Sequence, residues 1–277
     1  MAKTIFEQMG GTYTRVGDYY LPDLKLPEEE KQANIGVWGM RHKKFLKENH
    51  RVLYANLMTS GKLVTYLDDI ERQATNEMKT LVFIWLIILF MDNLLPLALA
   101  RFYSNYSHKE MALSVLGARQ SPVKWVYNVW CILSGIVFCV APFMLYQKYN
   151  SGLSIAIWIL LAIYGIGCEI ISGFCPLNEN KKDEDVITKI HGGASAVGFM
   201  TLLIVPLLLA ILQFQFSEIV MGVISLLLFI VAFVFFCFFV MGEKDKFAKT
   251  ILRYGGLWQR LVLVCCYVPL AIWCILT

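Results

Sequence analysis

The sequence predicts an all-α membrane protein, in which a six-helix transmembrane bundle follows a small, soluble, helical N-terminal segment. Apolar residues make up 57% of the chain and charged residues 17%, whereas roughly a quarter of an ordinary soluble domain is charged. Six long runs are apolar enough to cross a hydrocarbon core, and none alternates as a transmembrane strand does. Because backbone groups in lipid must be satisfied internally, we expect these runs to be helices.

The soluble segment, residues 1–78, holds eleven basic and eleven acidic residues. We expect no removable signal peptide, since this segment is polar and well mixed. Gly10-Gly11 predicts an extended or turn-rich start, and Pro27, followed by three glutamates, predicts a first helical turn. A second helix is expected over 37–59, and a third begins near Lys62 and continues into the first span.

The remaining residues, 79–277, form the predicted bundle. Each of its six apolar runs has about the 20 residues that a helix needs to cross roughly 30 Å. Few small-residue seams are visible between the runs. All eight cysteines lie in this part, most of them inside apolar runs where a thiol behaves as a small buried hydrophobe. The expected spans are 80–100, 125–146, 153–174, 194–214, 218–241 and 256–276.

Basic residues are distributed unevenly between the loops of the bundle. Eleven lysines and arginines lie in the loops after spans one, three and five, whereas the other loops and the C-terminus hold Lys148 alone. The positive-inside rule therefore places both ends of the bundle outside. The N-terminal segment nevertheless looks cytosolic, because it lacks cysteine and carries basic residues right up to Lys79. The first run, which contains Asp92 and Pro96, is therefore a candidate for incomplete crossing.

Ionisable groups inside the spans are the candidate functional residues, because each is costly in lipid. Asp92 is the deepest, and one interpretation is a proton or cation relay that faces the bundle interior together with Asn93 and Glu169. The alternatives are a structural hydrogen bond to a neighbouring helix and a misplaced span end. Glu169 and His191 flank the third loop, where they could share an interfacial pocket, capped by a segment ending at Pro176, that binds a headgroup or moves a proton. The alternative is a capping histidine and a snorkelling glutamate. Asn128 is the last of the residues that we consider candidates for binding a ligand or a proton.

No catalytic residue, metal ligand or cofactor is predicted. The bundle offers only His108 and His191, too few for a converging zinc or haem ligand set. An intramembrane enzyme with Ser121 or Cys175 as nucleophile is the least favoured alternative. The expected partners are the lipid bilayer of the cell membrane and an anionic lipid or small-molecule ligand. Nucleic acid is not expected despite the basic stretch 41–51, because the soluble segment has no net charge.

Two parts of the sequence resemble known families. Residues 1–75 include Gly36-Val-Trp-Gly-Met-Arg-His and Tyr66-Leu-Asp-Asp-Ile-Glu-Arg-Gln-Ala, and they resemble the transposon-encoded TnpV family. The remaining part includes Ala112-Leu-Ser-Val-Leu-Gly and Gly173-Phe-Cys-Pro, and it resembles the multi-pass prokaryotic membrane proteins of domain-of-unknown-function family 998. These resemblances imply a fusion at about residues 75–80 but carry no activity.

Two functions follow from this organisation. The first is an integral membrane protein that binds or transports a small molecule, lipid or proton, because Asp92, Glu169 and His191 lie in otherwise apolar helices. The alternative is a non-catalytic fusion product in which the TnpV-like segment is a passenger.

Overall fold

The computed structural model describes Thr4, Glu7 and residues 10–23, 35–178, 185–242, 244–247 and 249–277. Contacts divide the chain into two units, Met1–Glu77 and Met78–Thr277. Six helices are long and apolar enough to cross a membrane, which confirms the predicted all-α multi-pass bundle. The helical turn expected at Pro27 lies outside the described residues.

The N-terminal unit begins with a β-hairpin, the one departure from the all-α class within the described residues. Strand β1 (Tyr13–Val16) pairs antiparallel with β2 (Tyr19–Pro22). Gly17 lies in the turn between them with a φ of 66°, a left-handed conformation that glycine adopts without strain. The start predicted to be extended or turn-rich is therefore a strand pair.

Three helices follow the hairpin: α3 (Val37–Asn49), α4 (Arg51–Thr59) and α5 (Leu63–Leu99). The single helix expected over 37–59 is thus two helices, with His50 between them. The beginning of α5 packs on α3 through buried Leu46, Leu63 and Leu67. These contacts give the N-terminal unit a small core of its own.

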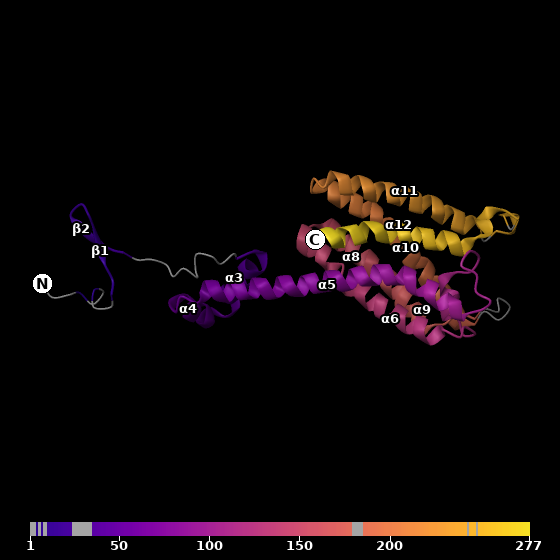
Figure 1. Cartoon of the computed structure of the whole chain (residues 1–277), viewed down its shortest axis with the longest axis horizontal. Helices are drawn as coiled ribbons and strands as arrows, with labels where there is room; N and C mark the ends of the chain where they lie inside the picture. The colour runs from indigo at the N-terminus through magenta and orange to yellow at the C-terminus, as the bar shows by residue number, and fades with distance from the viewer. Residues whose placement is uncertain are drawn as a thin grey trace. The chain divides into compact units, whose positions relative to one another are not determined.

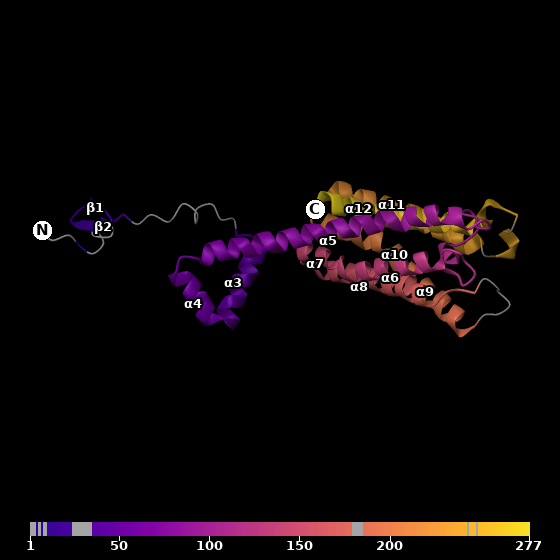
Figure 2. The same cartoon turned by 60° about the horizontal axis from the view of Figure 1, so that its bottom comes forward.

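The membrane unit consists of the second part of α5 and the helices that follow it. Their axes run side by side along the bundle (Figures 1 and 2). The third span is continuous but changes from α to π geometry over Gly165–Ile171. The other elements are α6 (Lys124–Val140), α7 (Phe143–Tyr149), α8 (Gly152–Tyr164), α9 (Ser172–Phe174), α10 (Val186–Gln215), α11 (Ile219–Gly242) and α12 (Gly255–Leu276).

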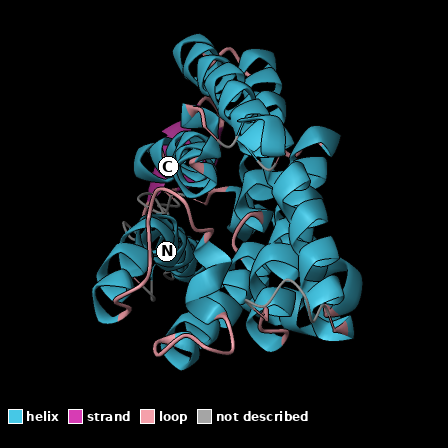
Figure 3. Ribbon diagram, turned by 90° about the vertical axis from the view of Figure 1, so that its right-hand side faces the viewer, coloured by secondary structure: helices cyan, strands magenta, loops and turns pink. Residues whose placement is uncertain are grey.

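The two ends of the bundle differ in their loops. The described parts of the loops after the first, third and fifth spans share one end of the bundle, here called the basic end. Nine of the eleven basic residues of the sequence pattern are described in the structure, and they lie at this end. Figure 3 looks along the helices from this side. The C-terminus lies at the other end, here called the opposite end (Figure 1), together with Lys148 and the turn between α10 and α11.

Small residues join the middle helices at close-packed seams. A Cβ added to Gly135 of α6 would lie 2.6 Å from the carbonyl oxygen of Gly165, in the π segment. A Cβ added to Gly167 would lie 2.5 Å from the carbonyl oxygen of Ala194, in α10. Such close backbone approach at small residues is a common way for helices to associate in lipid.

Helix α5 attaches to the bundle differently. Among the described residues, its backbone does not approach the backbone of another helix as closely as the other helices of the bundle approach one another. Its attachment relies instead on large or polar side chains, such as the buried Trp85, whose ring meets those of Phe138 and Trp273. Pro96 lies inside α5 without ending it. The first apolar run therefore has the length of a complete crossing, not the shortened one that Pro96 suggested.

Candidate functional site

The carboxyl group of Asp92 is the polar anchor of α5 in the bundle. Its side chain is 8% exposed and accepts three hydrogen bonds from two other helices. On α6, Trp130 Nε1 donates to Oδ1 at 2.7 Å and Ser134 Oγ donates to Oδ2 at 2.9 Å. On α12, the hydroxyl of Tyr267 donates to Oδ2 at 3.1 Å. In all three hydrogen bonds a carboxyl oxygen of Asp92 is the acceptor.

A pair of tyrosines connects Asp92 to a second carboxyl group. The hydroxyl oxygens of Tyr267 and Tyr164 lie 2.5 Å apart. The hydroxyl of Tyr164, at the end of α8, also bonds Oε1 of Glu169 at 2.9 Å. We call the chain Glu169–Tyr164–Tyr267–Asp92 the carboxyl relay.

Local helix geometry positions Glu169. Glu169 lies in the π segment Gly165–Ile171, where the wider turn changes the direction in which each side chain points. Single π turns of this kind are frequent at functional sites. The close approach of Gly135 to Gly165 holds this segment against α6, which also carries Trp130 and Ser134. One helix seam therefore supports both ends of the relay.

The relay runs from shallow to deep within the bundle. Glu169 lies five residues before Phe174, the end of its span, and therefore roughly 8 Å from the basic end at 1.5 Å per residue. Asp92 lies ten residues before Phe102, which places it roughly 15 Å from that end. Glu169 is half-buried, whereas Asp92 is buried.

An aromatic layer, formed by the rings of Trp85, Phe138 and Trp273, closes the deep end of the relay. The Phe138 ring packs against those of Tyr164, Tyr267 and Trp85, with centroids 5.0, 5.6 and 6.5 Å away. Trp85 is fully buried, and its Nε1 has no hydrogen-bond partner among the described residues. The relay therefore ends at an apolar barrier about halfway across the bundle.

The other predicted site residues lie outside the relay. His191 is buried, and its Nδ1 lies 2.8 Å from the carbonyl oxygen of Cys175. This contact is the capping role that was the alternative to a pocket shared with Glu169. Asn128 donates to the carbonyl oxygen of Gly117 at 3.2 Å and anchors a loop at the basic end. Pro176 is half-buried in the segment after α9. No group of three or more potential metal ligands occurs among the described residues.

Comparison with known proteins assigns the bundle to a family. The model of a protein family of unknown function (DUF998) matches residues 80–276, which is most of the chain. The chain belongs to the DUF998 family. A second model, of the transposon-encoded protein TnpV, matches residues 12–86. No curated protein and no solved structure matches the chain.

The two family matches meet within one helix. Residues 80–86 belong to both matches and lie inside α5, which runs without interruption from Leu63 to Leu99. Every residue of the carboxyl relay lies in the DUF998 part. The site is therefore built entirely by the membrane domain.

An ion pair joins two loops of the DUF998 domain at the basic end. Arg119 Nη2 lies 2.5 Å from Oδ2 of Asp185, and Oδ1 of Asp185 caps α10 by accepting from the backbone nitrogen of Thr188 at 2.9 Å. The hydrogen bonds from Thr188, followed by that from Arg119, lower the pKa of Asp185 from 3.8 to about 2. Asp185 is therefore ionised at neutral pH and ties the loop after the first span to the start of the fourth.

Sequence reasoning found both carboxyl groups of the relay but missed the residues that form hydrogen bonds to them. Trp130 and Ser134 lie in an apolar run, where an aromatic or small side chain usually signals packing alone. Tyr164 and Tyr267 carried a usable signal, because tyrosine is enriched at membrane interfaces and both lie ten or so residues inside their spans. A hydroxyl at that depth needs a hydrogen-bond partner.

Proposed function

We propose that the DUF998 bundle binds and exchanges protons inside the membrane through the carboxyl relay. The observation that carries this proposal is the unbroken chain of three contacts between Glu169 and Asp92. Each contact needs one proton between its two oxygens, so the chain needs three. Tyr164 and Tyr267 supply one each. The third must come from a carboxyl group, so the fully bonded relay holds one exchangeable proton.

Counting donors also places that proton. Asp92 accepts from Trp130 and Ser134 as well as from Tyr267, and ionised carboxylates are the stronger acceptors. In the resting arrangement Glu169 is protonated and donates to Tyr164, Tyr164 donates to Tyr267, and Tyr267 donates to ionised Asp92. If each of the three protons moves along its own hydrogen bond, the carboxyl proton leaves Glu169 and one arrives on Asp92, while both tyrosines remain neutral.

Charge balance supports the same conclusion. No ion pair of the described residues includes Asp92 or Glu169. A second ionised carboxylate in this apolar interior would lack a compensating cation, and desolvating an unpaired charge costs several kcal/mol. Holding one proton between the two groups avoids that cost. Gain and loss of this proton is therefore the chemistry that the site favours.

The proposal extends to location and partners. We place the protein in the cell membrane with the basic end toward the cytoplasm, because short loops rich in lysine and arginine favour that side. Glu169 would then exchange protons with the cytoplasmic side. The basic loops suit anionic lipid headgroups, at roughly 1 kcal/mol per charge. The TnpV-like segment contributes no residue to the relay, which favours a passenger role for it.

Proton entry into liposomes tests the proposal together with one further requirement, that the aromatic layer beyond Asp92 opens to let the proton cross the rest of the bundle. The purified full chain is reconstituted with a trapped pH-sensitive dye, and an acid pulse is applied outside. Tyr164→Phe keeps the ring but removes the hydroxyl that joins Glu169 to Tyr267. We expect it to slow proton entry at least roughly tenfold, the scale of losing one positioned proton-transfer group.

The matched control is Tyr146→Phe, a tyrosine of α7 that lies outside the relay. It should leave proton entry at the rate of the unmodified protein. If Tyr164→Phe also transported at that rate, the relay would have no part in proton movement.

A further inference from the structure

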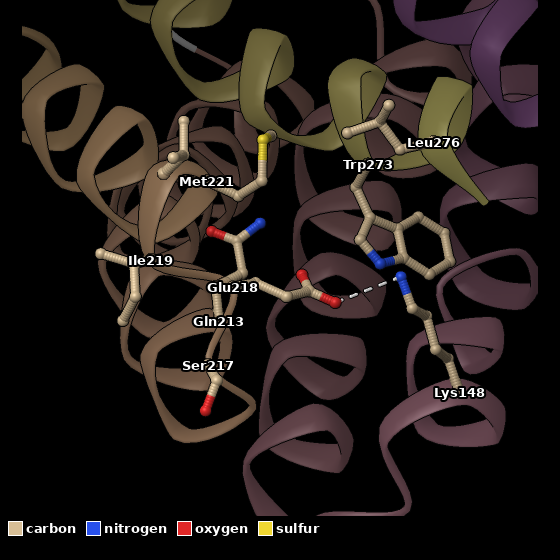
Figure 4. Close-up of a pocket in the computed structure, with 9 residues that line it drawn as sticks. Lys148, Gln213, Ser217, Glu218, Ile219, Met221, Trp273 and Leu276 are labelled. Carbon is tan, nitrogen blue, oxygen red and sulfur yellow. Dashed lines mark ion pairs between the residues drawn. The ribbon is translucent and has the colours of Figure 1, made fainter.

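A second polar site lies at the opposite end of the bundle, beyond the aromatic layer. It is a pocket of about 380 Å³ between the ends of α7, α10 and α12 and the start of α11 (Figure 4). Its polar walls are Lys148, Gln213 and Glu218, and its apolar walls include Met221, Trp273 and Leu276. This volume lies in the range of small-molecule sites, which are mostly apolar with a few placed polar groups.

The charged groups of the pocket form a supported pair. Lys148 Nζ lies 3.4 Å from Oε1 of Glu218, and the hydroxyl of Tyr149 donates to Oε2 of Glu218 at 2.8 Å. Trp273 Nε1 donates in turn to the Tyr149 hydroxyl at 3.1 Å. The ammonium group of Lys148 also lies over the rings of Tyr149 and Trp273. The pocket therefore presents one positive and one negative group, each held by neighbours.

Gln213 gives the pocket an unsatisfied hydrogen-bonding group. Its side chain is fully buried, and its Oε1 accepts a hydrogen bond from Ser225 at 2.7 Å. Its Nε2 has no partner among the described residues. Ser225 can satisfy only one arm of the amide, whichever way round the amide is placed. An unmet buried amide costs about 1–3 kcal/mol, so its retention beside a cavity indicates a bound molecule that completes it.

We propose that this pocket binds a zwitterion, a molecule that carries an anionic oxygen close to an ammonium group. The anionic oxygen accepts from Gln213 Nε2 and from Lys148, while the ammonium group meets the carboxylate of Glu218. The apolar part of the molecule lies along Met221 and Leu276. This chemistry is shared by the headgroup of phosphatidylethanolamine and by small free zwitterions. The site is separate from the carboxyl relay and does not depend on the function proposed for it.

Ligand-induced thermal stabilisation of the purified full chain tests the site and separates the two sources. One titration uses water-soluble glycerophosphoethanolamine in detergent, and the other uses phosphatidylethanolamine in nanodiscs made otherwise of phosphatidylglycerol. A rise in melting temperature with the soluble compound supports a free zwitterion as ligand. A rise with the lipid alone supports the headgroup. No rise with either would overturn the proposal.

Two variants tie the effect to the pocket. Gln213→Leu combined with Ser225→Ala removes the amide and its hydroxyl partner, so it should fold at least as stably as the unmodified protein. We expect it to need at least roughly tenfold more titrant for the same shift, equivalent to losing one hydrogen bond of about 1.4 kcal/mol. Lys148→Gln, at a partly exposed site, should weaken the response similarly.

The matched control is Gln215→Leu, an exposed glutamine two residues further along α10. Its titration curve should overlay that of the unmodified protein. If the Gln213 double variant responded to the same concentrations as this control, Gln213 would not contact the ligand and the proposal would fail.

Discussion

Asp92→Ala is expected to destabilise the bundle by at least about 3 kcal/mol, because it leaves the donors of Trp130, Ser134 and Tyr267 without their acceptor at about 1–3 kcal/mol each. The effect should be large for a second reason. Helix α5 lacks the close backbone seams of its neighbours, so this side chain is one of its main attachments. Thermal unfolding followed with a thiol-reactive dye measures the change, since buried thiols such as Cys131 and Cys266 react only after unfolding.

Asp92→Asn should fall between the unmodified protein and the alanine variant, because the amide keeps one acceptor oxygen but turns a donor toward other donors. Asn93→Ala is the matched control. The Asn93 side chain donates to Leu89 O of its own helix at 3.1 Å and links α5 to no other helix through that bond. If Asp92→Ala unfolded at the same temperature as Asn93→Ala, the three donors would not depend on Asp92.

Gly135→Val should separate α6 from the π segment and displace Glu169. A Cβ at this position would lie 2.6 Å from Gly165 O and 2.9 Å from the Cβ of Glu169, distances that real side chains do not tolerate. Overpacking of this kind costs typically about 1–3 kcal/mol. We expect a lower melting temperature and, in liposomes, a loss of proton entry close to that of Tyr164→Phe.

Gly193→Ala is the control for Gly135→Val, because it also replaces a helical glycine. A Cβ there meets nothing within 4 Å, and alanine is favoured over glycine inside a helix by about 1 kcal/mol. The melting temperature should therefore stay the same or rise. A fall as large as that of Gly135→Val would mean that any glycine replacement harms these helices, and the seam would lose its special importance.

Hydropathy was sufficient to predict the six spans, because a helix that must bury its backbone in lipid needs a long apolar run and little else. The continuity of α5 was also predictable, since no proline or glycine-rich linker separates its two parts. The split at His50 was not, because the residues on both sides of it favour helix. The hairpin at 13–22 depends on one glycine turn and carries a weak signal in so short a segment.

The relay shows where sequence reasoning stops. A uniformly apolar helix gives no hydrophobic stripe, so its rotation about its own axis is undetermined. Whether Asp92 faces Tyr267, which is far away in sequence, depends on that rotation. Glu169 adds a further difficulty, because the π segment redirects its side chain by an amount that an α-helical projection does not anticipate. The pocket that Glu169 and His191 were predicted to share followed only from their positions on either side of the third loop, and the two side chains have different partners in the structure.

The two polar sites and the aromatic layer between them give the bundle a simple order along its axis. The carboxyl relay lies toward the basic end, the rings of Trp85, Phe138 and Trp273 follow, and the zwitterion pocket lies at the opposite end. Trp273 belongs to both the aromatic layer and the pocket, since its ring meets that of Trp85 and its Nε1 donates to the Tyr149 hydroxyl. A change at the pocket therefore has a direct packing route to the layer that closes the relay.

Infrared difference spectroscopy of the carboxyl groups tests the central claim most directly. At neutral pH the unmodified protein should show the C=O band of a buried protonated carboxyl group, which shifts in heavy water and disappears in Glu169→Gln but persists in Glu218→Gln. That result would establish that the relay holds a proton on Glu169 while Asp92 is ionised. A neutral-pH spectrum that lacks a protonated carboxyl band, or has one that Glu169→Gln leaves unchanged, would contradict the account.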